Sequence, residues 1–254
     1  MNLFLHCLRS LRSFLWCLVP VCAALPVGHA TAAGFTVLLA DDSAPHAEFA
    51  RQMRAVVDDA PVTIAVGMAA ARAAIARPGA EPLLLAMLSQ LDYERLRTDP
   101  HLLRGDRRVG VLLRDPAMAD QLALIDAVLP LQKRRLGVVA TVDSGPLVRD
   151  LERAAVGWDL TVQYAPGPTA LAAALRTVVA RSDALMVLPD RIGDSQAATL
   201  SVLLAGAGAT LPVFGASDGL VRSGGLAAAV STPTQLAAQA RDIVQKLRRG
   251  ASGV

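Results

Sequence analysis

One short pattern occurs twice in the chain, and this repeat constrains the fold more than any other feature. The segment Thr36–Phe49 reads TVLLADDSAPHAEF, and Arg135–Leu151 reads RLGVVATVDSGPLVRDL. Setting Val37 against Val138 aligns the copies without a gap, and each shows an apolar run, an Asp-Ser turn, a proline and a helical pattern. Two copies are too few for a solenoid, which needs about three repeats or more. The repeat therefore predicts one chain with two lobes, each opening with a strand, a turn and a helix.

Segments with strand and helix patterns alternate along the chain. The expected strands are continuous apolar runs, which is typical of parallel strands buried on both faces. They cover Phe35–Ala40, Val62–Val66, Pro82–Leu88, Arg108–Leu113, Leu136–Thr141, Leu160–Tyr164, Ala184–Leu188, Leu211–Phe214 and Leu226–Val230. The predicted fold class is therefore α/β, with two Rossmann-like lobes that are each built on a parallel sheet.

Capping patterns predict where several helices begin. Asp115 followed by Pro116 reads as an N-cap with proline in the first turn. The segment Thr232–Gln235 has the pattern of a capping box, and the helix after it should end at Gly250. Its stripe of apolar residues consists of Leu236, Ala240, Ile243 and Leu247.

Residues 1–32 have the pattern of a secretory signal peptide. Arg9 and Arg12 form a basic start, Phe14–Leu25 is an apolar core, and Ala30–Ala32 is a cleavage site of small residues. We predict cleavage after Ala32 and a periplasmic location. A retained membrane anchor is the alternative, although the apolar run is short and interrupted for a membrane span.

The predicted signal segment changes what composition implies for the mature chain. All three cysteines lie in it, so the mature chain has no disulfide, thiolate metal site or cysteine nucleophile. The segment holds two of the 25 basic residues and no acid, which leaves 23 basic residues against 22 acidic ones. Nothing in this balance indicates a nucleic-acid partner. We interpret His46 and His101 as surface residues, because neither has a second ligand at metal-binding spacing, and we expect a monomer without metal or cofactor.

Candidate ligand-binding residues follow the expected strands, because ligands of parallel sheets bind beyond the carboxyl ends of the strands. A helix N-terminus favours an anion, so Ser43 and Ser144 are assigned to a ligand carboxylate. A buried ammonium needs an acid partner, so Asp190 or Asp218 is assigned to an amine. The predicted ligand-binding residues are Asp42, Ser43, Thr141, Asp143, Ser144, Asp190, Arg191, Ser217 and Asp218. Simple capping and Asx turns would explain the serines and several of the acids equally well.

The segment Asp183–Gln239 resembles a known family. Its motifs are DALMVLPD at Asp183–Asp190, LPV at Leu211–Val213, VRSGGLA at Val221–Ala227 and STPTQLAAQ at Ser231–Gln239. These resemble substrate-binding proteins of ATP-binding-cassette (ABC) transporters with the type I periplasmic-binding fold, in the branch that includes aromatic-amino-acid binders. The chain departs from the family pattern at Arg191–Asp194 and at Gly219-Leu220, where the family often has polar or aromatic residues.

The resemblance implies two lobes joined by a hinge that close on a small ligand. It places the first lobe at residues 33–133, completed by 231–250, and the second at 134–230. The implied function is capture of a small polar, amino-acid-like ligand for an ABC importer, with a membrane permease as partner. A ligand-sensing module for a membrane signalling protein is the alternative. An enzyme that uses the cavity between the lobes is less favoured, because the mature sequence has no cysteine, no paired histidine and no G-x-S-x-G motif.

Overall fold

The computed structural model describes residues 36–54, 61–103, 107–130 and 132–250. The predicted signal peptide lies outside the described residues, so its cleavage after Ala32 stays a prediction. Within the described ranges, no helix has both the length and the apolar character needed to span a membrane.

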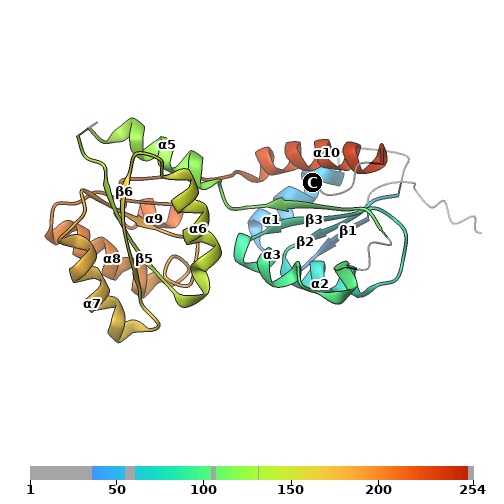
Figure 1. Cartoon of the computed structure of the whole chain (residues 1–254). Helices are drawn as coiled ribbons and strands as arrows, with labels where there is room; N and C mark the ends of the chain where they lie inside the picture. The colour runs from blue at the N-terminus through green and yellow to red at the C-terminus, as the bar shows by residue number, and fades with distance from the viewer. Residues whose placement is uncertain (1–35, 55–60, 104–106, 131, 251–254) are drawn as a thin grey trace, which may run out of the picture. The chain divides into compact units, whose positions relative to one another are not determined.

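The first lobe contains a four-stranded parallel sheet in the order β1-β2-β3-β4 (Figure 1). Its strands are β1 (Thr36–Leu39), β2 (Thr63–Val66), β3 (Leu83–Leu88) and β4 (Val109–Leu113). One face is covered by α1 (Ala44–Arg54) and α10 (Pro233–Arg248). The other face is covered by α2 (Met68–Ala76), α3 (Gln90–Leu96) and α4 (Pro100–Leu103).

The second lobe contains a five-stranded parallel sheet in the order β6-β5-β7-β8-β9. Its strands are β5 (Arg135–Ala140), β6 (Asp159–Tyr164), β7 (Ala184–Val187), β8 (Val213–Gly215) and β9 (Ala227–Ala228). One face is covered by α5 (Met118–Val128) and α6 (Gly145–Ala154), which follows the 3₁₀ turn η1 (Val142–Ser144). The other is covered by α7 (Pro168–Val179), α8 (Gln196–Gly208) and α9 (Asp218–Arg222). Two parallel sheets flanked by helices confirm the predicted α/β fold class.

Helix α5 packs on the second sheet, although the predicted boundary at residue 133 assigned it to the first lobe. Its buried Leu122 and Ile125 lie in the same apolar cluster as Leu136 and Leu147. The corresponding face of the first sheet is already covered by α1 and α10, so the apolar stripe of α5 is buried on the second sheet instead. The chain thus passes to the second sheet in segment 114–117 and returns in segment 229–232.

The two sequence copies occupy different places in their sheets. Among the described strands β1 pairs only with β2, at a sheet edge, whereas β5 lies between β6 and β7. The local succession of strand, turn and helix is the same, but the pairing partners differ. Only the second sheet therefore reverses its strand order, which opens a crevice beyond the ends of β5 and β7.

Helix α10 begins at the predicted capping box. Thr232 Oγ1 accepts a hydrogen bond from the Gln235 amide at 3.2 Å, and Gln235 Oε1 accepts one from the Thr232 amide at 2.9 Å. The stripe from Leu236 to Leu247 is buried against Phe49 of α1 and the first sheet. A segment more than 100 residues beyond β4 therefore supplies part of the first lobe's core.

Candidate ligand-binding site

A cavity is lined by residues that follow strands of both sheets. The first lobe contributes residues after β1 and β4 and one residue of β3, together with the start of α10. The second lobe contributes the last residue of β7, residues after β7 and β8, and residues of α8 and α9. Of the predicted ligand-binding residues, Ser43, Ser217 and Asp218 are in the lining.

Asp41 connects Ser43 and His46 in the first-lobe wall of the cavity. Its Oδ1 accepts a hydrogen bond from the Ser43 amide at 3.0 Å and lies 2.8 Å from His46 Nδ1. The hydrogen bonds from Ser43, followed by that of His46, lower the pKa of Asp41 from 3.8 to about 2. Asp41 is therefore ionised at neutral pH and carries a fixed negative charge beside the cavity.

His46 is not the surface residue that the sequence suggested. It is only 9% exposed and lies against Gly67, where an added Cβ would be 3.0 Å from His46 Cε1. Gly67 has a φ of 81°, a left-handed conformation that suits glycine. The helix places His46 on the inner face of α1, so its ring reaches Asp41 and the cavity.

Asp115 caps a helix other than the one that the sequence predicted. Its Oδ2 accepts a hydrogen bond of 2.7 Å from the amide of Gln90, the first residue of α3. Helix α5 begins later, at Met118, with Ala117 at its N-cap position and no side-chain cap. The end of β4 lies beside the end of β3, which brings Asp115 to α3.

Burial raises the pKa of Asp115, with smaller upward contributions from the carboxylates of Asp194 and Asp92. The hydrogen bond from Gln90 and the charge of Arg114 act in the opposite direction. The side chain of Asp115 is 8% exposed, against 46% for Arg114. Asp115 is thus the least solvated of the acids in the cavity lining, and the raised pKa agrees with this burial.

Met87 contributes a strained backbone to the same wall. Its φ is 57°, in the left-handed region that non-glycine residues rarely adopt, and the register of β3 with β4 shifts at this point. Such a conformation costs about 1 kcal/mol or more. The irregularity places the buried Met87 side chain in the cavity lining.

The second-lobe wall carries two exposed acids. Ser217 Oγ accepts a hydrogen bond from the Leu220 amide at 3.1 Å, so Ser217 caps α9 and leaves Asp218 at the cavity. Asp194 lines the cavity from the loop after β7. Within the described residues, neither Asp194 nor Asp218 has a side-chain hydrogen bond or ion pair. Both carboxylates can therefore accept bonds from a ligand.

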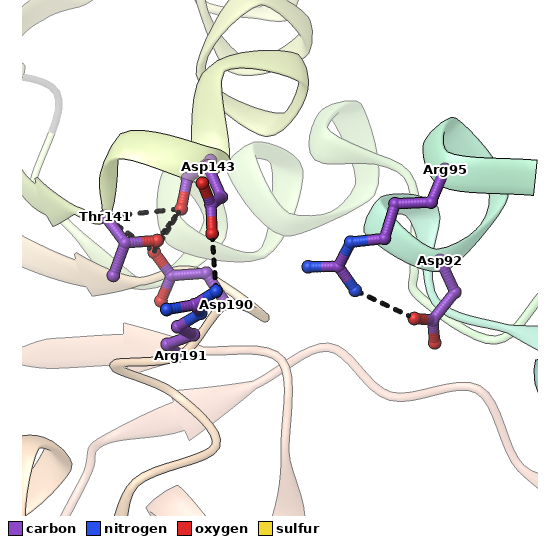
Figure 2. Close-up of polar contacts among 7 residues, drawn as sticks. Asp92, Arg95, Thr141, Asp143, Asp190 and Arg191 are labelled. Atoms are coloured by element: carbon purple, nitrogen blue, oxygen red, sulfur yellow. Dashed lines mark hydrogen bonds and ion pairs between the residues drawn. The ribbon is translucent and has the colours of Figure 1, made fainter. Parts of the chain in front are cut away.

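Asp190 is the centre of a buried network and does not line the cavity (Figure 2). Its Oδ2 accepts hydrogen bonds from the Thr141 amide at 3.0 Å and from Ser144 Oγ at 2.5 Å. Its Oδ1 accepts from the amides of Ile192 at 2.8 Å and Gly193 at 3.3 Å. Asp190 is 1% exposed and Ser144 is fully buried. The carboxylate is satisfied by the protein itself.

This network gives Asp190 and Ser144 a structural role, and their predicted contacts with a ligand stay predictions. The Ser144 hydroxyl bonds to Asp190 and does not cap α6. Both residues lie at the ends of the neighbouring strands β5 and β7, where the rule of strand ends predicts a ligand site. Both carboxylate oxygens of Asp190 are thus engaged by groups of the protein itself.

The remaining predicted residues lie outside the cavity lining. Asp143 and Arg191 form an ion pair with 2.8 Å between Oδ2 and a guanidinium nitrogen, and both are well exposed (Figure 2). Thr141 and Arg191 line a smaller hollow on the second lobe. Asp42 is exposed. The predicted contacts of these four residues with a ligand stay predictions.

Sequence reasoning did not assign four of the six titratable residues of the cavity lining to ligand binding, namely His46, Arg114, Asp115 and Asp194. Asp41 directly follows the first strand, and the rule of strand ends selects it together with Asp42. Because Pro116 follows Asp115, the sequence predicts that Asp115 caps the next helix. The position of His46 five residues after Asp41 was a usable signal for the cavity lining. His46 is the third residue of its helix, and a side chain in the first helical turn can reach back over the end of the preceding strand.

Comparisons with solved structures give three likenesses. A substrate-binding protein with adhesive properties from Clostridium difficile, in a ligand-free, open structure, is 16% identical, with a TM-score of 0.62 over 86% of this chain and 85% of that one. An ABC domain in complex with L-Trp from Streptococcus pneumonia is 19% identical, with a TM-score of 0.50 over 82% and 69%. A conserved domain protein from Vibrio cholerae is 20% identical, with a TM-score of 0.51 over 82% and 70%.

These likenesses show the fold. The chain shares the α/β fold of a solved substrate-binding protein. No family model matches the sequence, and no curated protein matches it either. Identities of 20% or less show the fold alone and assign no residue roles to this chain.

Proposed function

We propose that this chain is an extracytoplasmic solute-binding protein that captures a small polar, amino-acid-like ligand for an ABC importer. The observation that supports this most directly is the cavity at the strand ends of both sheets, in a fold shared with solved substrate-binding proteins. Strand ends and helix starts present oriented N–H groups and side chains without further rearrangement.

Capture would proceed by closure of the two lobes. Within the described residues, the backbone passes between the two sheets in the segments 114–117 and 229–232, and both border the cavity through Arg114 and Val230. A few residues at the ends of elements can absorb the dihedral changes of a hinge. Closure would remove the ligand from water and strengthen each charged contact.

Ligand binding is tested by a thermal-shift screen of amino acids and other small polar solutes. A ligand that binds only the native state stabilises it, by about 2.7 kcal/mol at a concentration of 100 times the dissociation constant. We expect a raised melting temperature with an unchanged ligand recovered afterwards. Turnover of the ligand would instead support an enzyme.

Export and transport are tested separately. N-terminal sequencing of the protein from the periplasm should begin at Ala33, and a full-length chain in the membrane would indicate a retained anchor. Cells that lack the protein should take up the identified ligand more slowly. Unchanged uptake with a lost transcriptional response to the ligand would support the sensory alternative.

A further inference from the structure

The cavity of the proposed binding protein has an uneven charge. Its described lining contains four carboxylates, from Asp41, Asp115, Asp194 and Asp218, against one guanidinium, from Arg114. Each lobe contributes two of the acids, so the excess belongs to both walls.

The acids differ in how far the protein already satisfies them. Asp41 is held by Ser43 and His46, and Asp115 accepts from Gln90 with Arg114 3.6 Å away. Within the described part of the chain, Asp194 and Asp218 have no such side-chain partner. A ligand that enters the cavity therefore meets two unengaged carboxylates on the second lobe and two partly engaged ones on the first.

The rest of the lining limits the kind of cation. No three acids or histidines of the described residues are grouped as a metal site would need. The described lining contains no Phe, Tyr or Trp side chain, so it offers no aromatic cage for a quaternary ammonium. The uncharged wall includes Met87, Val187, Leu188 and Leu220, which suit a methylene chain.

We infer that the ligand is a compound with net positive charge, in which amine or guanidinium groups are joined by an aliphatic chain, such as a diamine or a basic amino acid. This inference rests on the proposed solute-binding function and names the ligand class of the same cavity. Asp194 and Asp218 bind the cationic groups from the second lobe, with Asp41 and Asp115 opposite them in the lining. Amines and guanidinium groups carry several N–H donors, which match carboxylate acceptors.

The experiment is isothermal titration of the purified full chain with putrescine, spermidine, lysine and arginine, and with leucine, tryptophan and glutamate for comparison. We expect at least one of the four cations to bind more tightly than every uncharged or acidic solute. Its affinity should fall as salt rises, because ionic attraction is screened. Tighter binding of leucine, tryptophan or glutamate overturns the cationic assignment and leaves solute binding intact. Absence of binding by the whole panel counts against both the assignment and the proposed function.

Variants then locate the contact. Asp194→Asn and Asp218→Asn should each weaken binding of the cation about tenfold, between the effect of an exposed ion pair and that of a fully desolvated one. Asp242→Asn, on the exposed side of α10, removes the same charge away from the cavity and should leave affinity unchanged. Equal affinities in all three variants would overturn the assignment, as would equal losses in all three.

Discussion

Ser144 Oγ donates a hydrogen bond of 2.5 Å to Asp190 Oδ2, which joins the ends of β5 and β7 across 46 residues of sequence. Thr141 adds its amide to the same oxygen at 3.0 Å. In the second lobe the strand order reverses between β5 and β7, and a buried polar network connects the ends of these two neighbouring strands.

Asp190→Ala should therefore destabilise the protein. The substitution removes the side-chain acceptor of the Ile192 and Gly193 amides. It also removes one of the two partners of the Thr141 amide and of the Ser144 hydroxyl, which keep their bonds to each other's residue. Buried unsatisfied groups cost about 1–3 kcal/mol each before relaxation. We expect the free energy of unfolding to fall by about 3 kcal/mol in urea denaturation.

Asp143→Ala is the matched control, because Asp143 precedes Ser144 and its ion pair with Arg191 is exposed. Loss of such a pair costs about 0–1 kcal/mol. If Asp190→Ala denatures at the wild-type urea concentration and loses ligand affinity, Asp190 binds the ligand after all.

The sequence predicts the strands and helix starts of the chain better than it predicts which strands and side chains contact one another. All nine expected strands have counterparts, and the capping box at Thr232 is present, because apolar runs and caps depend on neighbouring residues. The bond between Ser144 and Asp190 depends on β5 pairing with β7, and the cap of α3 by Asp115 depends on β4 lying beside β3. These pairings join distant segments, and no local pattern specifies them.

Protonation of Asp41 should reduce stability at low pH. Its folded pKa of about 2 lies below the ordinary 3.8, so the native state binds fewer protons than the unfolded state between these values. The stabilising contribution is present above about pH 4 and is lost as pH falls towards 2. We expect the stability of Asp41→Asn to decline less steeply than wild type in that range, measured by urea denaturation at stepped pH. Parallel curves for the two proteins would contradict the assignment.

Gly193→Ala should destabilise the loop that holds Asp190. A Cβ at this position would lie 2.2 Å from the carbonyl oxygen of Leu188, a backbone atom that cannot rotate away. The Gly193 amide also donates to Asp190 at 3.3 Å, so a shifted loop weakens the buried network. Overpacking of this kind costs about 1–3 kcal/mol, which thermal unfolding will detect.

Gly208→Ala serves as the control for this substitution. Gly208 is the last residue of α8, and nothing lies within 4 Å of the Cβ position there. Alanine is the better helix former, so the melting temperature should stay the same or rise slightly. Comparable losses at Gly193 and Gly208 would show that the clash with Leu188 is absent.

The packing of α10 on the first sheet is tested by a double-mutant cycle. A Cβ on Gly110 of β4 would lie 2.6 Å from Ile243 Cγ2, so Gly110→Ala should cost about 1–3 kcal/mol. In the Ile243→Ala background the clashing atom is gone and the same substitution should cost less, with a coupling energy of about 0.5–3 kcal/mol. Leu236→Ala, seven residues earlier on α10, lies about 10 Å away along the helix and should combine additively with Gly110→Ala. Additivity in both pairs would mean that Ile243 does not contact β4 at Gly110 and that α10 covers the sheet in another register.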